Sequence, residues 1–145
     1  MRSCLLSLSL ILSVAIPMAG GTQSLQQMIE RAQKASEKDQ PGLYMKIAER
    51  RLQDADRLYH AHQPAEASAA VSDIVTYCDH AYEAADRSDK KLKNTEIGIR
   101  KIADKLQDIR RELDFENQAP VEAAVNHLEG LRTKLLTRMF GKEKK

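Results

Sequence analysis

Apolar residues recur in alternating steps of four and three through the middle of the chain. The series starts at Ala67, ends at Leu113, and keeps its phase through the polar stretch RSDKKLKNTE at residues 87–96. A 3.5-residue repeat that holds its phase over many turns is typical of one continuous helix with one packing face. The pattern therefore predicts a helix over residues 64–113, about 50 residues and about 75 Å long. Its apolar face consists of Ala67, Val71, Ile74, Cys78, Ala81, Ala85, Ser88, Leu92, Thr95, Ile99, Ile102, Leu106, Ile109 and Leu113.

The polar stretch also contains acid–base pairs at a spacing that supports a helix. In each pair the acid precedes the base by four residues, which is the favourable order and contributes about 0.2–0.5 kcal/mol in an isolated helix. The alternative is a break between Ser88 and Thr95, where Ser, Asn and Thr side chains can cap a new helix. The pairs are Glu83 with Arg87, Asp86 with Lys90, Asp89 with Lys93, and Glu96 with Arg100.

Three shorter helices flank the central one, at about residues 24–38, 43–62 and 120–140. Ser24 and Gln27 have the spacing of a capping box at the start of the first. Pro64 suits the first turn of the central helix, and Pro120 is expected to open the last one after a turn at FENQAP. Gly141 and the basic tail GKEKK then end the chain.

The fold class expected from these elements is all-α. Short turns make consecutive helices antiparallel neighbours, so the chain is predicted to form elongated helical hairpins built on the central helix. Counted back from each turn, the partner helices cover about residues 65–84 and 94–113 and leave 85–93 uncovered. The alternative is a compact four-helix bundle, which requires the break in the polar stretch.

The first 21 residues have the pattern of a secretory signal peptide. Arg2 precedes an uncharged apolar run from Cys4 to Ile16, and small residues follow at Ala19 and Gly21. The run is shorter than the ~20 residues that a membrane-spanning helix needs. We therefore expect residues 22–145 to form a single helical domain that is periplasmic or secreted.

The charge balance argues against nucleic acid as a partner. The chain has 23 Lys and Arg against 21 Asp and Glu, for a net charge of +2. Basic groups are interspersed with acids, which is typical of a solvated surface. The basic tail GKEKK is the segment suited to weak contact with an anionic envelope surface.

No pattern of catalytic or metal-ligating residues emerges, so we expect neither an enzyme nor a bound cofactor or metal. His60 and His62 are two residues apart and point to different sides of a helix, and His80 and His127 lie elsewhere. Once the leader is removed, Cys78 is the only cysteine, and its place in the apolar series predicts a small buried side chain.

The tyrosines are concentrated in one region of the chain. Tyr is favoured on recognition surfaces, although it also fills gaps between helices. If the protein has a binding face, these residues are its candidates: Tyr44, Tyr59, Tyr77 and Tyr82.

One hairpin resembles a tetratricopeptide repeat. The stretch ADRLYHAHQPAEASAAV, residues 55–71, has Tyr59 near the end of one helix, a short turn, and Glu66, Ala67 and Ala70 on the next. It has His62 or Gln63 where that family usually has Gly, and no 34-residue repeat follows. The resemblance implies a similar local hairpin and a role in binding peptides or assembling complexes. The chain as a whole resembles exported all-helical bacterial proteins.

The sequence therefore favours a non-enzymatic exported interaction protein, such as a scaffold, adaptor or chaperone-like module of the cell envelope. Its partner would be another protein or a second copy of the chain. The alternative is a helical bundle that binds a small ligand or a metal.

Overall fold

Five helices account for almost all of the chain that the computed structural model describes, residues 23–141. They are α1 (Leu25–Lys34), α2 (Gln40–His60), α3 (Pro64–Ser88), α4 (Leu92–Glu112) and α5 (Phe115–Phe140). The all-α prediction is confirmed, since this part of the chain contains no strand. The predicted signal peptide, residues 1–21, and the last four residues of the basic tail lie outside the described residues.

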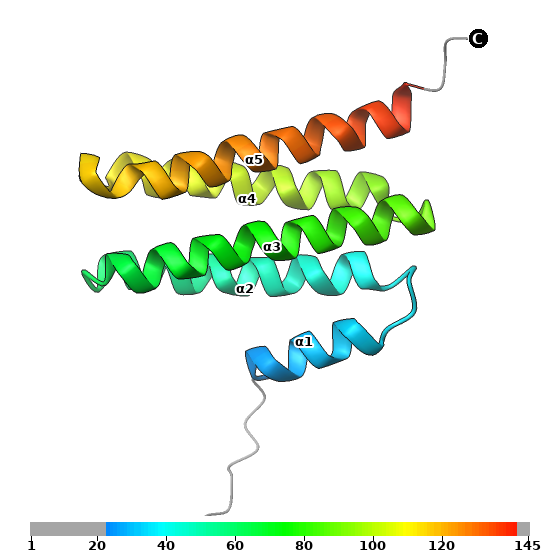
Figure 1. The fold of residues 1–145 in the computed structure, drawn as a ribbon, viewed down its shortest axis with the longest axis horizontal. Helices are drawn as coiled ribbons and strands as arrows, with labels where there is room; N and C mark the ends of the chain where they lie inside the picture. Colours follow the sequence, from blue (N-terminus) through cyan, green and yellow to red (C-terminus); the bar gives the residue numbers. More distant parts are fainter. Residues whose placement is uncertain (1–22, 142–145) are drawn as a thin grey trace, which may run out of the picture.

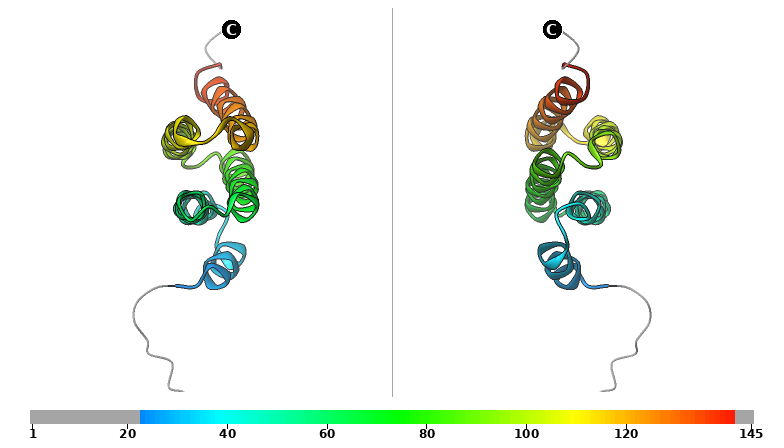
Figure 2. Two further views of the ribbon diagram at one scale, coloured as in Figure 1. Left: turned by 90° about the vertical axis from the view of Figure 1, so that its left-hand side faces the viewer. Right: turned by 90° about the vertical axis from the view of Figure 1, so that its right-hand side faces the viewer.

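The four long helices run alternately up and down and pack as a bundle (Figure 1). α2 and α3 form one hairpin, and α4 and α5 form a second. Seen from its ends, the bundle has α5 beside α3 and α4 beside α2, while α1 packs on the outer side of α2 (Figure 2). The bundle therefore has two ends. One carries the α2–α3 and α4–α5 turns, and the other carries the α1–α2 loop and the α3–α4 turn.

The prediction of one continuous helix over residues 64–113 is wrong. α3 ends at Ser88 and α4 begins at Leu92. Asp89 and Lys91 between them have φ values of 54° and 58°, in the left-handed region that reverses the direction of a helical chain. The break lies inside the stretch that the alternative named, so the compact four-helix bundle is the observed arrangement.

Hydrogen bonds around Ser88 end α3 locally. Its hydroxyl donates to the Ala84 carbonyl over 2.7 Å. The backbone N–H of Lys90 donates in turn to the Ser88 Oγ over 3.3 Å. The Ser88 hydroxyl thus forms hydrogen bonds with backbone groups at the end of the helix, where such groups are otherwise left unpaired.

Ion pairs to other helices hold the α3–α4 turn in place. Arg138 on α5 reaches Asp86 over 3.0 Å and Asp89 over 3.4 Å. Lys91 lies 3.7 Å from Asp39, which precedes α2. None of the four acid–base pairs expected along a continuous helix forms within 4.0 Å among the described residues. Asp86, Asp89 and Lys91 instead pair with residues far away in the sequence.

The apolar series did identify the buried face correctly. Because both helices keep the same 3.5-residue phase, both present it to the core after the chain reverses. Ser88, Leu92 and Leu113 at the helix ends are only partly buried. The buried members are Ala67, Val71, Ile74, Cys78, Ala81, Ala85, Thr95, Ile99, Ile102, Leu106 and Ile109.

The boundaries of the flanking helices differ from prediction at several points. The capping box is confirmed: the Gln27 N–H donates to Ser24 Oγ over 3.2 Å, and the Ser24 N–H donates to Gln27 Oε1 over 3.1 Å. α1 is shorter than expected, and α2 begins three residues earlier. α5 begins at Phe115, so FENQAP is helical and Pro120 lies inside the helix. Pro120 is exposed there and costs the helix one backbone hydrogen bond.

One buried carboxylate joins α4 to α5. Glu96 is only 8% exposed and accepts a hydrogen bond from Arg132 Nε over 3.0 Å. The same guanidinium donates to Glu129 over 2.8 Å. Arg132 therefore offsets the cost of burying the Glu96 charge, and neither partner is replaceable alone.

Candidate functional site

The four tyrosines do not share one face, although two of them form an aromatic cluster. Tyr44 on α2 stacks on Tyr77 of α3, with ring centroids 6.4 Å apart. His80 lies 5.2 Å from the Tyr44 ring and 6.0 Å from the Tyr77 ring. Both tyrosines are half-buried and the His80 side chain is exposed. We call Tyr44, Tyr77 and His80 the aromatic cluster.

The other two tyrosines lie apart from this cluster. Tyr82 points toward α5, where the Lys134 ammonium lies 5.7 Å from its ring centroid. Tyr59 lies near the C-terminus of α2 and lines a cavity at that end of the bundle. The four residues singled out by the sequence therefore occupy three separate places.

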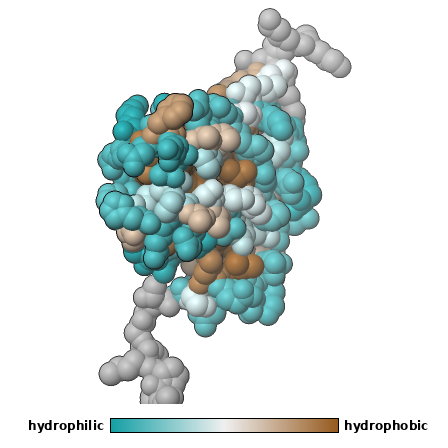
Figure 3. All heavy atoms as spheres, turned by 60° about the vertical axis from the view of Figure 1, so that its left-hand side comes forward, coloured by the Kyte–Doolittle hydropathy of each residue, from teal (hydrophilic) through white to brown (hydrophobic). Residues whose placement is uncertain are grey.

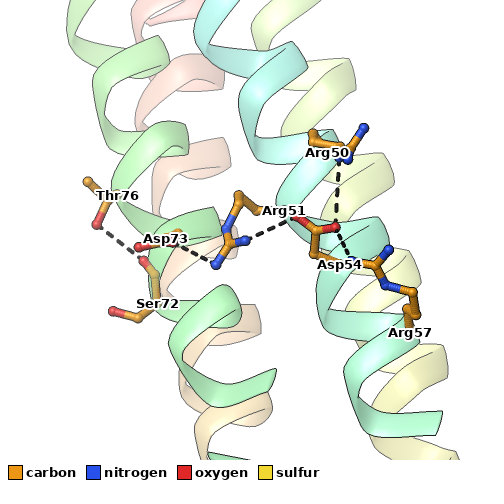
Figure 4. A network of polar contacts seen from close by, with 7 residues as sticks. All are labelled: Arg50, Arg51, Asp54, Arg57, Ser72, Asp73 and Thr76. Atoms are coloured by element: carbon orange, nitrogen blue, oxygen red, sulfur yellow. Dashed lines mark hydrogen bonds and ion pairs between the residues drawn. The ribbon is translucent and has the colours of Figure 1, made fainter. Parts of the chain in front are cut away.

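A charged network lies beside the aromatic cluster and ties α2 to α3 (Figure 4). Arg51 reaches Asp54 on its own helix over 3.0 Å and Asp73 on α3 over 2.9 Å. Burial raises the pKa of the Tyr77 hydroxyl, and the negative charge of Asp73 raises it further. This hydroxyl therefore stays neutral and available as a hydrogen-bond donor.

A cavity of about 290 Å³ opens where the α2–α3 and α4–α5 turns meet. It has an apolar floor and a polar rim. A second hollow of about 260 Å³ adjoins it, shares Tyr59, His62, Glu112 and Leu113, and adds Asp114. We call the two together the end pocket. Figure 3 brings this end of the bundle forward and shows apolar surface between hydrophilic side chains. The first cavity is lined by Asp56, Tyr59, His60, His62, Ile109, Glu112 and Leu113.

One histidine on the rim has a fixed orientation. His60 Nδ1 lies 2.8 Å from the backbone carbonyl oxygen of Asp56. A carbonyl can only accept, so Nδ1 carries a proton and Nε2 faces Glu112 at 3.9 Å. Main-chain contact of this kind sets which ring nitrogen is presented to a binding partner.

The Tyr59 hydroxyl is buried and has no hydrogen-bond partner among the described residues. Burial raises its pKa, so the group is neutral and carries its proton. An unpaired buried hydroxyl costs about 1–3 kcal/mol. The Tyr59 side chain lines the end pocket, but its hydroxyl oxygen is closed to solvent, so this unsatisfied donor lies behind the pocket surface.

His62 occupies the turn position that most often holds glycine. Its φ is 56°, and the Gln63 N–H bonds back to the Leu58 carbonyl over 2.9 Å, as in a Schellman motif. A side chain at this position is strained relative to glycine. This backbone conformation places the His62 imidazole at the rim of the end pocket.

The opposite end of the bundle has a groove of contrasting charge. It measures about 740 Å³ and lies between α1, the start of α2 and the α3–α4 turn. Four of its lining residues are basic and one is acidic. We call it the basic groove. Its charged residues are Arg31, Lys34, Lys46 and Lys91, with Asp39.

Other candidate groups are unsuited to metal binding or nucleophilic chemistry. In residues 23–141, no three His, Cys, Asp or Glu side chains gather in a way that holds a metal ion. Cys78 is fully buried as predicted, and desolvation raises the pKa of its thiol far above the usual range. His127 pairs with Asp79 over 2.7 Å and links α5 to α3.

The sequence named Tyr59 and considered His60 and His62, but it did not reveal that they converge with Glu112. That convergence depends on two turns about 50 residues apart in the chain coming together. None of the helices within residues 23–141 has the length and hydropathy that crossing a bilayer requires. No protein-family model matches the chain, and neither a curated protein nor a solved structure is significantly similar to it.

Proposed function

We propose that this protein is a non-enzymatic, exported interaction protein, a scaffold, adaptor or chaperone-like module of the cell envelope. Its partner is another protein or a second copy of the chain. The observation that carries this proposal is the aromatic cluster of Tyr44, Tyr77 and His80.

The composition of this cluster supports a recognition role. Tyr and Arg are enriched among residues that dominate binding energy at interfaces. The two half-buried tyrosine rings are already held against each other, so little side-chain freedom is lost when a partner covers them. Arg51 and Asp73 lie next to Tyr77 and add polar groups beside the apolar rings.

The test compares residues 22–145 with the double variant Tyr44→Ser/Tyr77→Ser in light-scattering mass and in capture of partners from an envelope extract. The matched control is Tyr82→Ser, which removes a tyrosine outside the cluster. We expect the double variant to lose self-association or capture and the control to keep it. A monomer that captures nothing, or equal capture by all three proteins, contradicts the proposal.

Export and a weak envelope contact belong to the same proposal. They are supported by the leader pattern in residues 1–21 and by the excess of basic residues in the groove and the tail. Sequencing the N-terminus of protein recovered from the periplasm tests export. Cosedimentation with anionic vesicles at low and high salt tests the contact, which salt should abolish.

A second candidate function, a small-ligand-binding bundle, is favoured by the end pocket. It is a concave, largely apolar cavity with a few polar groups directed into it, which is the usual form of a small-molecule site. The metal-binding version has no ligand set of three within the described residues. Binding of a chemically varied fragment library, followed by NMR, tests the small-ligand version.

A further inference from the structure

We propose that the end pocket binds a small organic cation with an apolar body, such as an aralkylammonium ion. This inference rests on the second candidate function and names its ligand class. It does not depend on the interaction role of the aromatic cluster.

The first argument is the charge of the pocket rim. Three carboxylates line the end pocket, those of Asp56, Glu112 and Asp114, and no lining residue is Lys or Arg. Across residues 23–141, no Lys or Arg nitrogen lies within 4.0 Å of these three carboxylates, and the nearest basic group is His60, 3.6 Å from Asp56 and 3.9 Å from Glu112. The rim therefore carries uncompensated negative charge.

The neighbouring arginines do not supply that compensation, because each pairs with another carboxylate. Arg57 binds Asp54 over 2.9 Å, Arg111 binds Asp108 over 2.9 Å, and Arg110 reaches Glu122 over 3.7 Å. Similar carboxylates placed together repel each other, and a bound cation removes that repulsion. The charge pattern thus selects a cation over a neutral or anionic ligand.

The second argument is the shape and lining of the cavity. Ile109 and Leu113 provide an apolar surface, and the Tyr59 ring provides an aromatic one. An ammonium group is attracted to the face of such a ring as well as to carboxylates. A volume of about 290 Å³ suits a ligand the size of one ring with a short chain.

The Tyr59 hydroxyl supplies the third argument. It is a buried donor without a partner, and its oxygen is closed to solvent in the free protein, so a ligand oxygen recovers this hydrogen bond by displacing the side chains that cover it. A ligand with a hydroxyl on its apolar body therefore binds more tightly than the same ligand without one.

The experiment titrates phenethylamine, the neutral 2-phenylethanol and the anionic 3-phenylpropionate into residues 22–145 and follows backbone amide shifts by NMR. We expect saturable shifts for the amine, centred on the α2–α3 and α4–α5 turns, and at least fivefold weaker binding of the other two. Glu112→Gln should weaken amine binding at least threefold. The matched control Asp104→Asn, an exposed acid of α4 outside the pocket, should not.

A second comparison tests the hydroxyl. Tyramine should bind more tightly than phenethylamine to the unaltered protein, and Tyr59→Phe should remove this advantage while keeping the ring. Equal affinities of the two amines for the unaltered protein overturn the role given to Tyr59.

The possible failures are distinguishable. Saturable binding of the neutral or anionic compound at the same turns, with no response to the amine, overturns the ligand class and leaves a binding site. No saturable shift with any probe up to about 10 mM, the concentration that corresponds to a binding free energy of about −2.7 kcal/mol, overturns the site itself. Neither outcome affects the test of Tyr44 and Tyr77.

Discussion

The two ends of the bundle are built alike but carry opposite charge. Each contains a helix-reversing turn with left-handed residues that are not glycine: His62 at one end, Asp89 and Lys91 at the other. At the groove end, most lining charges are basic, whereas the end pocket is lined by carboxylates and histidines. One helical bundle thus has a surface hollow of opposite charge at each end.

The ends also differ in how their charges are used. At the groove end, Arg132 and Arg138 of α5 pair with acids of α4 and α3, and Lys91 of the turn pairs with Asp39 just before α2. At the pocket end, Arg111 bonds within its own helix, and Arg110 reaches Glu122 on α5 over 3.7 Å. Ion pairs between helices therefore occur at both ends, but within residues 23–141 the three carboxylates of the end pocket have no Lys or Arg partner within 4.0 Å.

The largest effect is expected from breaking the buried pair at the groove end. Arg132→Met keeps the apolar stem but leaves the buried Glu96 carboxylate without its partner, so unfolding free energy should fall by about 2–4 kcal/mol. Chemical denaturation at neutral pH measures it.

The matched control is Arg111→Met, which removes an exposed pair with Asp108 near the pocket end and should cost less than about 1 kcal/mol. Adding Glu96→Leu to Arg132→Met should restore most of the lost stability. Equal losses in the two arginine variants would show that the ends do not differ in this way.

Replacing the left-handed residues with glycine tests both turns. The sign of the change in unfolding free energy shows whether the residue has a positive φ. His62→Gly should raise unfolding free energy by up to about 1 kcal/mol because glycine adopts positive φ without strain. Asp89→Gly/Lys91→Gly should be neutral to stabilising by about 1 kcal/mol, since lost exposed ion pairs offset part of the gain.

A continuous helix through residues 87–96 requires the opposite result. Glycine inside a helix costs roughly 0.5–1 kcal/mol per position. If the double variant lost about 1–2 kcal/mol of unfolding free energy, the result would support a continuous helix and refute the turn.

The difficulty of predicting this turn has a physical origin. The apolar series continues in phase from Ala85 to Leu92, so periodicity alone cannot distinguish one helix from two. Neither left-handed residue is a glycine, and no proline follows. The ion pairs that hold the turn join Arg138 to residues about 50 positions away, a contact that no local pattern contains. Two signs were available: the uncovered stretch from turn counting, and the capping residues between Ser88 and Thr95.

Removing the unpaired hydroxyl at the pocket end should stabilise the free protein. Tyr59→Phe deletes a buried donor that has no partner and keeps the ring, so unfolding free energy should rise by about 1 kcal/mol. Thermal denaturation measures it, with Tyr82→Phe as the control that should change little. A loss of stability would mean that the hydroxyl is satisfied in the free protein.

The smallest effect is a pH dependence at the groove end. The Ser36 hydroxyl, which donates to Asp39 over 2.7 Å, lowers the pKa of that carboxyl below its usual 3.8, and the charge of Lys91 lowers it further. Because the folded pKa is depressed, the stability that this group contributes is present above pH 3.8 and is lost as the pH falls through the folded pKa. NMR titration of the Asp39 carboxyl group measures its pKa. A midpoint at or above 3.8, or one that Ser36→Ala does not raise, contradicts this account.

The sites were less predictable than the helices. The capping box at Ser24 and the buried face of Cys78 follow from local spacing, and both are observed. The end pocket requires that His60, Glu112 and Asp114 meet, which depends on the packing of two hairpins. The sequence shows the types of these three residues but not that they lie together, because the predicted central helix kept the two hairpins apart.

The reversal of the chain at Asp89–Lys91 underlies both ends, and small-angle X-ray scattering with light-scattering mass tests it most directly. For residues 22–145 as a monomer, a bundle of this length should have a radius of gyration of about 14 Å. A continuous helix of about 75 Å would raise it above about 20 Å. The first result is the one we predict, and the second would contradict the bundle and with it the end pocket.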